Sequence, residues 1–371
     1  MDDEKFIDTS IALFESSDRC ENIYFVYLPE YKSSPLYIKS QKITIIRSKN
    51  DILEILSSIE KIDGIIMHYY DDQKAETLIE LKKRYPKAKA IWFAWGKDFY
   101  QAIDYPLYNK KTKQLLRKKQ WIRSIIKTLV KPLLKYRYEK GVWYSAIPLI
   151  DYCSPVLPNE FSQIKKLKGF RAQQILYSYL EPEAIDFLKN KIQNIQLGDN
   201  ILIGNSATPT NNHLDIFQKI KEEKLPGKLI VPLSYGEPIW YKDIIIEKGN
   251  LLFGKYFYPL IDFMQIEDYI DLISSCNVVI YDHYRQQGMG NISTMLYFGA
   301  RVYLSEKSIA YQYYKALGVH VYSLEKDFTK YKFSKLGVEK IIENREIMNN
   351  NIYNKEILVN ILNSILQVLE N

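Results

Sequence analysis

The chain alternates short apolar runs with longer segments in which apolar residues recur every three or four positions. The short runs are typical of buried strands, and the longer spacing is typical of helices with one buried face. The predicted strands are Ile23–Tyr27, Ile43–Ile46, Ile65–Tyr69, Ala90–Trp95, Ile201–Ile203, Leu229–Leu233, Leu251–Phe253, Val278–Tyr281 and Val302–Leu304. The predicted helices cover about 51–61, 72–85, 211–223, 238–247, 265–275, 289–299, 308–317 and parts of 338–371.

Strands that alternate with helices indicate βαβ units and parallel sheets. Two such series predict an α/β protein with two Rossmann-like, doubly wound domains that face a central cleft. We expect an N-terminal domain over 1–190, a C-terminal domain over 195–340, and helices over 341–371 that pack back on the N-terminal domain. Ligands of open parallel sheets bind beyond the carboxyl ends of the strands, so candidate chemistry is sought there.

Charge is concentrated in one segment of the chain. The whole sequence has a net charge of +7. Residues 109–140 hold twelve lysines and arginines against one acid, Glu139, which leaves the rest of the chain mildly acidic. A general nucleic-acid coat protein would be basic throughout, so this distribution argues against one.

The basic segment also has an apolar helical face, and Pro132 is expected to kink it. A helix with adjoining apolar and cationic faces suits an anionic membrane surface. The residues expected to contact the membrane are Lys119, Trp121, Arg123, Lys127, Lys131 and Lys135. The alternatives are a core-packed helix with solvated lysines and, less favoured, RNA binding, because the spacing of an RNA-binding module is absent.

The ends of the chain and its cysteines suggest a protein of the cytoplasm. The N-terminus has no signal-peptide pattern, and no apolar stretch is long enough to span a membrane. Cys20, Cys153 and Cys276 have no metal-binding spacing, and we expect buried free thiols.

Polar loops after the strands of the second domain are the candidate anion site. Arg285 can form paired hydrogen bonds to phosphate, and Gly288 and Gly290 leave backbone amides accessible where a helix begins. Tyr235 could stack on a base. The residues expected to bind a nucleotide sugar are Gly204, Asn205, Ser206, Tyr235, Arg285, Gln286, Gln287, Gly288, Gly290, Asn291 and Thr294. A plain turn with a helix cap is the alternative for Gly204–Ser206.

The first domain offers two candidate bases, His68 and Asp98, each near the end of a predicted strand. His68 could instead be structural, and Asp98 could cap the helix that follows it. His213 and His320 are expected at the surface or in packing. No Asp-x-Asp motif, Walker A motif or dinucleotide fingerprint is present, so we expect no metal and no cofactor.

Four strings resemble, in order and spacing, those of the TDP-N-acetylfucosamine:lipid II N-acetylfucosaminyltransferases, glycosyltransferase family 56. They are Trp95-Gly96-Lys97-Asp98-Phe99-Tyr100, Gly204-Asn205-Ser206, Val231-Pro232-Leu233-Ser234-Tyr235 and Arg285-Gln286-Gln287-Gly288-Met289-Gly290. The resemblance covers roughly 60–320 and is strongest over 201–320. It departs at Lys97, where the family has Ala, and at Leu233-Ser234, where it has Met-Gly.

The resemblance implies a GT-B fold and a hexosyltransferase. Because no Asp-x-Asp motif is present, we expect metal-independent transfer, and of the two stereochemical outcomes we favour inversion. It implies a TDP-activated 4-acetamido-4,6-dideoxyhexose donor and a polyprenyl-diphosphate-linked saccharide acceptor, at the cytoplasmic face of the inner membrane. The first 60 residues match poorly, so common antigen, O-antigen and capsule synthesis stay open. The rival functions are a GT-B nucleotide-sugar epimerase and a non-enzymatic nucleic-acid-binding protein.

Overall fold

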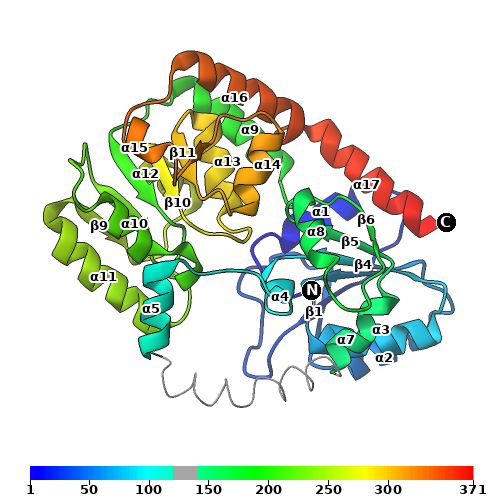
Figure 1. The fold of residues 1–371 in the computed structure, drawn as a ribbon. Coiled ribbons are helices and arrows are strands. Elements are labelled where there is room, and N and C mark those ends of the chain that lie inside the picture. Colours follow the sequence, from blue (N-terminus) through cyan, green and yellow to red (C-terminus); the bar gives the residue numbers. More distant parts are fainter. Residues whose placement is uncertain (120–140, 371) are drawn as a thin grey trace. The chain divides into compact units, whose positions relative to one another are not determined.

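A computed structural model describes residues 1–119 and 141–370 of the chain, and Figure 1 shows its elements. The described residues form two compact units. Unit 1 contains 1–105, 141–184 and 355–370, and unit 2 contains 106–119 and 185–354. The chain therefore passes between the units more than once, whereas the sequence predicted nearly continuous domains.

Unit 2 is built on one six-stranded parallel sheet with the order β12-β11-β10-β7-β8-β9. Its strands are β7 (Asn200–Ile203), β8 (Leu229–Pro232), β9 (Phe257–Leu260), β10 (Cys276–Tyr281), β11 (Arg301–Leu304) and β12 (Tyr322–Ser323). Its helices are α5 (Lys110–Lys119), α10 (His213–Ile220), α11 (Ile239–Phe253), α12 (Ile266–Ile273), α13 (Met289–Phe298), α14 (Ile309–Ala316), α15 (Phe328–Tyr331) and α16 (Val338–Asn351). Helix α9 (Pro182–Lys191) leads into this unit.

The sheet of unit 2 is wound in both directions from β7. The chain moves from β7 to β8 and β9 on one side, and then returns to place β10 against the other edge of β7. The strand order therefore reverses between β7 and β10. In open parallel sheets the loops at such a reversal diverge and leave room for a ligand.

Strand composition explains why this sheet lies in the interior. Every residue of β8, β10 and β11 is buried, and the strands are rich in Val, Ile, Leu and Tyr. A parallel strand covered by helices on both faces needs apolar residues at successive positions rather than in alternation. This pattern allowed the sequence to locate β7, β8, β10 and β11.

One predicted strand is wrong. Leu251–Phe253 forms the last turn of α11, and the strand of this region is β9 at Phe257–Leu260. Gly254 adopts φ +50° and ends the helix, so the chain turns there before it enters the sheet. A short apolar run does not distinguish a helix from a strand, and here Gly254 marks the end of the helix.

Unit 1 contains two parallel sheets. One pairs β1 (Tyr24–Tyr27) with β2 (Ile43–Ile46), and the other has the order β3-β4-β5-β6. The latter strands are β3 (Gly64–His68), β4 (Lys89–Ala94), β5 (Tyr152–Pro155) and β6 (Gln173–Gln174). The helices are α1 (Ile7–Glu15), α2 (Lys49–Ile55), α3 (Asp72–Arg84), α4 (Lys97–Tyr100), α7 (Val142–Ala146), α8 (Phe161–Ile164) and α17 (Lys355–Glu370).

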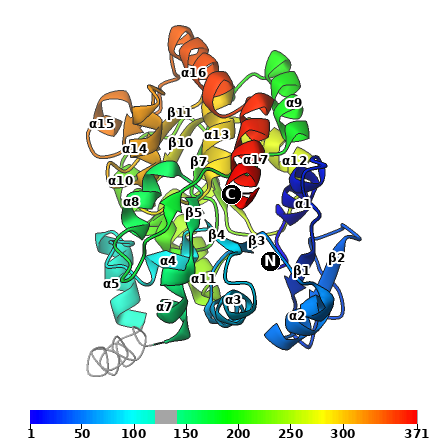
Figure 2. The same cartoon turned by 90° about the vertical axis from the view of Figure 1, so that its right-hand side faces the viewer.

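The C-terminal helix α17 packs in unit 1, beside α1 (Figure 2). Its buried face consists of Leu358, Ile361, Leu362, Ile365 and Leu366. These residues join a core cluster that includes Ile7, Ile11 and Phe14 of α1. Arg19 also forms a pair of hydrogen bonds to Glu370, which holds the end of α17.

Helix α5, where the basic segment begins, packs on unit 2 rather than on the N-terminal domain to which the sequence assigned it (Figure 1). Asp215 of α10 accepts hydrogen bonds from the backbone amides of Lys111 and Thr112, at 2.7 and 2.9 Å. Leu115 packs against the core of unit 2. A carboxylate at a helix N-terminus satisfies free amides and opposes the positive end of the helix dipole. Residues 120–140, including the predicted kink at Pro132, lie outside the described residues.

No helix within 1–119 or 141–370 combines the length and the apolar character needed to cross a membrane. All three cysteines are free thiols. Cys153 and Cys276 are buried as expected, whereas Cys20 is partly exposed.

The packing of α17 predicts that two alanine substitutions on this helix have unequal effects on stability. Ile365→Ala removes a fully buried side chain and should lower the free energy of unfolding by about 2–5 kcal/mol. Val359→Ala is the control, because Val359 is 56% exposed, and should change it by less than about 0.5 kcal/mol. Urea unfolding, combined with hydrogen exchange of the unit 1 strands, measures both. Equal effects would contradict the assignment of α17 to this core.

Candidate active site

Three loops meet at the carboxyl edge of the unit 2 sheet, and Asn205 joins them. The Asn205 side-chain amide donates a hydrogen bond to the hydroxyl of Tyr235, which follows β8, at 3.0 Å. Its carbonyl oxygen accepts one from Nε2 of Gln287, which follows β10, at 2.9 Å. The hydroxyl of Thr210 donates to Oε1 of Gln287 at 2.6 Å. This chain of contacts spans the reversal between β7 and β10.

Asn211 holds the loop after β7 in its shape. Its side-chain amide donates to the carbonyl oxygen of Ser206 at 2.8 Å, and its Oδ1 accepts from the amide of Asn205 at 3.2 Å. The Ser206 hydroxyl also contacts Asn211 and Thr208, and Ser206 is 2% exposed. Ser206, predicted to contact a ligand, thus contributes chiefly to the loop itself.

Two glycines permit the close approach of these loops. Gly204 has φ +64°, and a Cβ there would lie 2.6 Å from Nε2 of His213. Gly288 has φ +63°, and a Cβ there would lie 3.1 Å from Cβ of Asn205. Gly290 has open space around it and an ordinary φ. Positive φ and close packing therefore require glycine at 204 and 288, whereas Gly290 leaves space above the first turn of α13.

The start of α13 carries the candidate anion-binding groups. Gly288 caps this ten-residue helix, and the free amides of its first turn give the site partial positive charge. Arg285 is half-buried, and its guanidinium donates a hydrogen bond to the carbonyl oxygen of Gln286 at 3.0 Å. Gln287 points inward to Asn205, so the two glutamines have different surroundings.

The last two predicted residues lie on different sides of α13. The Asn291 side-chain amide donates to the hydroxyl of Tyr269 at 2.7 Å, which links α13 to α12. Thr294 is buried and contacts Tyr353 instead. The sequence missed Tyr269, Thr210 and Asn211. The only available signal for the last two was the run of short polar residues between Gly204 and α10.

Asp282 and His283 begin the loop after β10, and both are buried. Burial raises the pKa of Asp282 to about 7 and lowers the pKa of His283 to about 3. Asp282 Oδ2 accepts a hydrogen bond from the side-chain amide of Asn109 at 2.9 Å. His213, below Gly204, is also buried with a pKa lowered to about 3, so both imidazoles are neutral. His213 is a packing residue, one of the two roles expected for it.

In unit 1, Asp98 lies in the first turn of α4, shortly after β4, and is 6% exposed. Its carboxylate accepts hydrogen bonds from Nε1 of Trp92 at 2.9 Å, from the amide of Trp95 at 3.1 Å and from the amide of Tyr70 at 3.2 Å. Burial nevertheless raises its pKa to about 7. The pKa suits a general base at neutral pH, whereas the bound donors suit a group that fixes the turn at Trp95–Lys97.

His68 lies at the end of β3 among Phe93, Tyr177 and Tyr179. Nε1 of Trp95 donates to the Tyr179 hydroxyl at 2.6 Å, and His68 Nδ1 lies 2.9 Å from the same oxygen. The Tyr179 hydroxyl therefore links the indole of Trp95 to the imidazole of His68. Burial holds the pKa of His68 well below its usual range, so His68 is neutral and a weak base.

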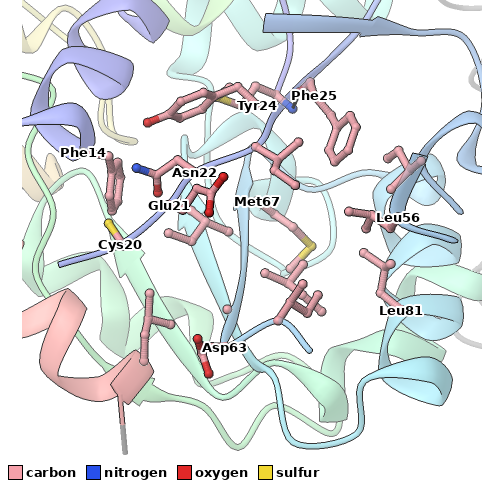
Figure 3. Close-up of a pocket in the computed structure, with 18 of the residues that line it drawn as sticks. Phe14, Cys20, Glu21, Asn22, Tyr24, Phe25, Leu56, Asp63, Met67 and Leu81 are labelled. Atoms are coloured by element: carbon pink, nitrogen blue, oxygen red, sulfur yellow. Dashed lines mark hydrogen bonds between the residues drawn. The ribbon is translucent and has the colours of Figure 1, made fainter. Parts of the chain in front are cut away.

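A cavity of about 680 Å³ lies in unit 1, between β1 and β3 (Figure 3). Its lining includes Phe14, Phe25, Leu56, Met67, Leu81 and Leu366. The cations in the described lining are all paired: Arg19 with Glu370, Lys61 with Asp63, and Lys74 with Asp2 and Asp71. Apolar walls and neutralised cations do not suit a diphosphate.

Among the described residues, no group of three or more His, Cys, Asp or Glu side chains is arranged to hold a metal ion.

Residues 162–337 match the family model described as "4-alpha-L-fucosyltransferase glycosyl transferase group 56". These residues belong to glycosyltransferase group 56. The matched region contains all three loops that Asn205 joins, as well as α13. Asp98 and His68 precede it. The group 56 region begins within unit 1 and covers all of unit 2 from 185 to 337, so it leaves out α5 and α16.

Solved structures similar to nearly the whole chain confirm the α/β, GT-B fold class. Sucrose-phosphate synthase from Thermosynechococcus elongatus has a TM-score of 0.61 at 10% identity and covers 93% of this chain and 88% of its own. An alpha,alpha-trehalose-phosphate synthase (UDP-forming) from Burkholderia xenovorans has a TM-score of 0.59 at 9% identity, covering 97% and 96%. The structure titled "Trehalose-6-phosphate from E. coli bound with UDP-2-fluoro glucose" has a TM-score of 0.57 at 13% identity, covering 99% and 96%.

The two glycines at the start of α13 predict opposite responses to alanine. Gly288→Ala places a side chain at positive φ against Asn205 and should destabilise the group 56 region by about 1–2 kcal/mol. Gly290→Ala meets no neighbour and should leave stability unchanged or raise it by up to about 1 kcal/mol. Thermal unfolding of the two variants beside the wild type measures the difference. Equal loss at both positions would refute the role of φ at Gly288.

Proposed function

We propose that the protein transfers a 4-acetamido-4,6-dideoxyhexose from a TDP-sugar to a polyprenyl-diphosphate-linked oligosaccharide in bacterial surface polysaccharide synthesis. The observation that supports this most is the junction at Asn205, where three loops of the group 56 region meet at the sheet reversal. The description of the matching family as fucosyltransferases supports a deoxyhexose donor. Common antigen, O-antigen and capsule remain equal choices for the product.

The donor diphosphate is proposed to bind at the start of α13. Arg285 would pair with phosphate oxygens, and the amides around Gly288 and Gly290 would add hydrogen bonds. Tyr235 is 57% exposed and would stack on the base, while its hydroxyl remains bonded to Asn205. Asn291 and Gln286 border the same helix start, and Thr294 would support it from the buried side.

The proposed reaction is an inverting displacement. An acceptor hydroxyl attacks the anomeric carbon, the bond between that carbon and the diphosphate oxygen breaks, and TDP leaves with the bonding pair. Arg285 and the helix amides would stabilise the negative charge that develops on the leaving diphosphate. The hydroxyl proton passes to a base, for which Asp98 is proposed first and His68 second.

The acceptor is proposed to reach the protein at the cytoplasmic face of the inner membrane. Six cations of α5 are exposed: Lys110, Lys111, Lys113, Arg117, Lys118 and Lys119. Lys119 belongs to the predicted membrane contacts, and its ammonium also lies 5.8 Å from the ring centre of Trp240. The other predicted contacts, Trp121, Arg123, Lys127, Lys131 and Lys135, lie outside the described residues.

Nucleotide binding tests the donor site. TDP should raise the thermal unfolding midpoint more than UDP or GDP does, because a ligand that binds only the folded state stabilises it. Arg285→Ala should weaken TDP binding at least about tenfold, since a charge-assisted hydrogen bond contributes roughly 1.5–3 kcal/mol. Arg171→Ala is the control, because Arg171 is exposed in unit 1.

Unchanged TDP binding by the Arg285 variant would refute the diphosphate site. Release of an epimerised sugar nucleotide in place of transfer to a lipid-linked acceptor would favour an epimerase. Salt-sensitive RNA binding without TDP binding would favour the nucleic-acid function.

The proposed base predicts a pH dependence of turnover. A base must be ionised, and burial raises the pKa of Asp98 to about 7, so kcat/KM should rise as the pH increases through 7. Asp98→Asn retains an oxygen that can accept from the Trp95 amide and should lower kcat by about 10²–10⁴. A pH profile without this inflection, with an effect on KM alone, would limit Asp98 to holding the turn at Trp95.

A further inference from the structure

The residue before α5, Asn109, is bonded to both loops at the sheet reversal. Its backbone amide donates to Oδ1 of Asn212, which ends the loop after β7, at 2.9 Å. Its side-chain amide donates to Oδ2 of Asp282, which begins the loop after β10, at 2.9 Å. Asn212 in turn donates to the carbonyl oxygen of Asp282 at 2.7 Å. Three residues from three segments therefore form one closed set of contacts.

Asn109 also begins the basic helix. Its Oδ1 accepts from the amide of Lys110 at 2.8 Å, so the same side chain caps α5 and contacts Asp282. Asp215 fixes the next two amides and the hydroxyl of Thr112. The orientation of α5 and the spacing of the two loops are thus set by shared hydrogen bonds.

The exposed side of α5 is cationic and faces away from these contacts. Thr112 is buried, whereas the lysines and arginine around it are exposed. Within the described part of the chain, none of these cations pairs with a carboxylate. An anionic surface could bind them without breaking the contacts that hold α5 to unit 2.

The geometry points to Asn109 as a positioning residue that couples the surface bound by α5 to the nucleotide site. An anionic surface that holds α5 would reinforce the Asn109 contacts, and these hold the loop of Asn205 and the loop of Arg285 at their present spacing. A nucleoside diphosphate bound between the loops would reinforce the same contacts. Coupling of this kind is reciprocal, so each ligand raises the affinity for the other by the same factor. This inference rests on the donor site proposed above, and it adds that the membrane regulates nucleotide binding at that site.

Swapping the amide of Asn109 and the carboxylate of Asp282 tests the positioning role without any ligand. Asn109→Asp sets two carboxylates against each other, and hydrogen exchange should increase in both 204–212 and 282–291. Adding Asp282→Asn restores a donor opposite an acceptor and should return exchange in both loops towards the wild-type rate. Gln114→Asp, at an exposed position of α5, is the control for added charge on this helix. Unchanged exchange in Asn109→Asp, or no rescue by the double variant, would overturn the role of Asn109.

Vesicle binding tests the coupling. Vesicles that contain phosphatidylglycerol should raise TDP affinity about fivefold or more, and saturating TDP should raise vesicle affinity by the same factor. Asn109→Asp should abolish this mutual effect, and the double variant should restore it. The pair Arg117→Gln and Lys118→Gln should weaken vesicle binding while TDP affinity in solution stays unchanged. Equal TDP affinity with and without vesicles would overturn the coupling.

Failure of the proposed function gives a different result. If TDP does not bind to the wild type at all, the donor site is wrong. The exchange experiment still decides whether Asn109 positions the two loops, because it uses no nucleotide.

Discussion

The hydrogen bonds of Asn205 are the constraint on which the candidate site depends. β7 and β10 are neighbours in the sheet, but their loops come from parts of the chain about eighty residues apart. The side chain of Asn205 carries both a donor and an acceptor, so it can donate to one loop and accept from another at the same time. Its contacts to Tyr235 and Gln287 bring the loops after β8, β7 and β10 to one place, and Gly288 lets α13 begin directly beside it.

The buried groups of this junction are almost all neutral. Asn205, Asn211, Thr210 and Gln287 satisfy one another, whereas a buried ion pair would carry a desolvation cost of several kcal/mol per ion. His213 and His283 follow the same rule, because burial keeps both imidazoles uncharged. The positive charge in the proposed site then comes from Arg285 and the start of α13, at the margin of the neutral network, where an anionic ligand can reach them.

The sequence predicted four strands of the unit 2 sheet, β7, β8, β10 and β11, because buried parallel strands are apolar runs. It also predicted the loops after β7 and β10, where Gly204 and Gly288 adopt a positive φ that other residues rarely adopt. It did not predict which polar residues bind one another. Gln286 and Gln287 are the same residue type at adjacent positions, so the sequence cannot tell which one is buried. In the structure Gln287 points inward and bonds to Asn205. The sequence predicted that the C-terminal helices pack on the N-terminal domain, but it did not identify α1 as the partner of α17. The sequence identified Asp98 as a candidate base but did not predict its burial. The side chain of Trp92 and the backbone amide of Tyr70 that bond to Asp98 are brought to it by the fold.

The placement of α5 changes how the basic segment is understood. Its first turn carries three lysines, where the helix dipole disfavours positive charge, so this helix is poorly stabilised by its own sequence. Asp215 supplies the missing negative charge, and Asn109 supplies the cap, and both contacts exist only when α5 lies on unit 2. A helix that needs another element to begin keeps a fixed orientation on that element. The cations of α5 are therefore fixed relative to the loops of the candidate donor site. An anionic surface that binds these cations acts on unit 2, which also contains the donor site.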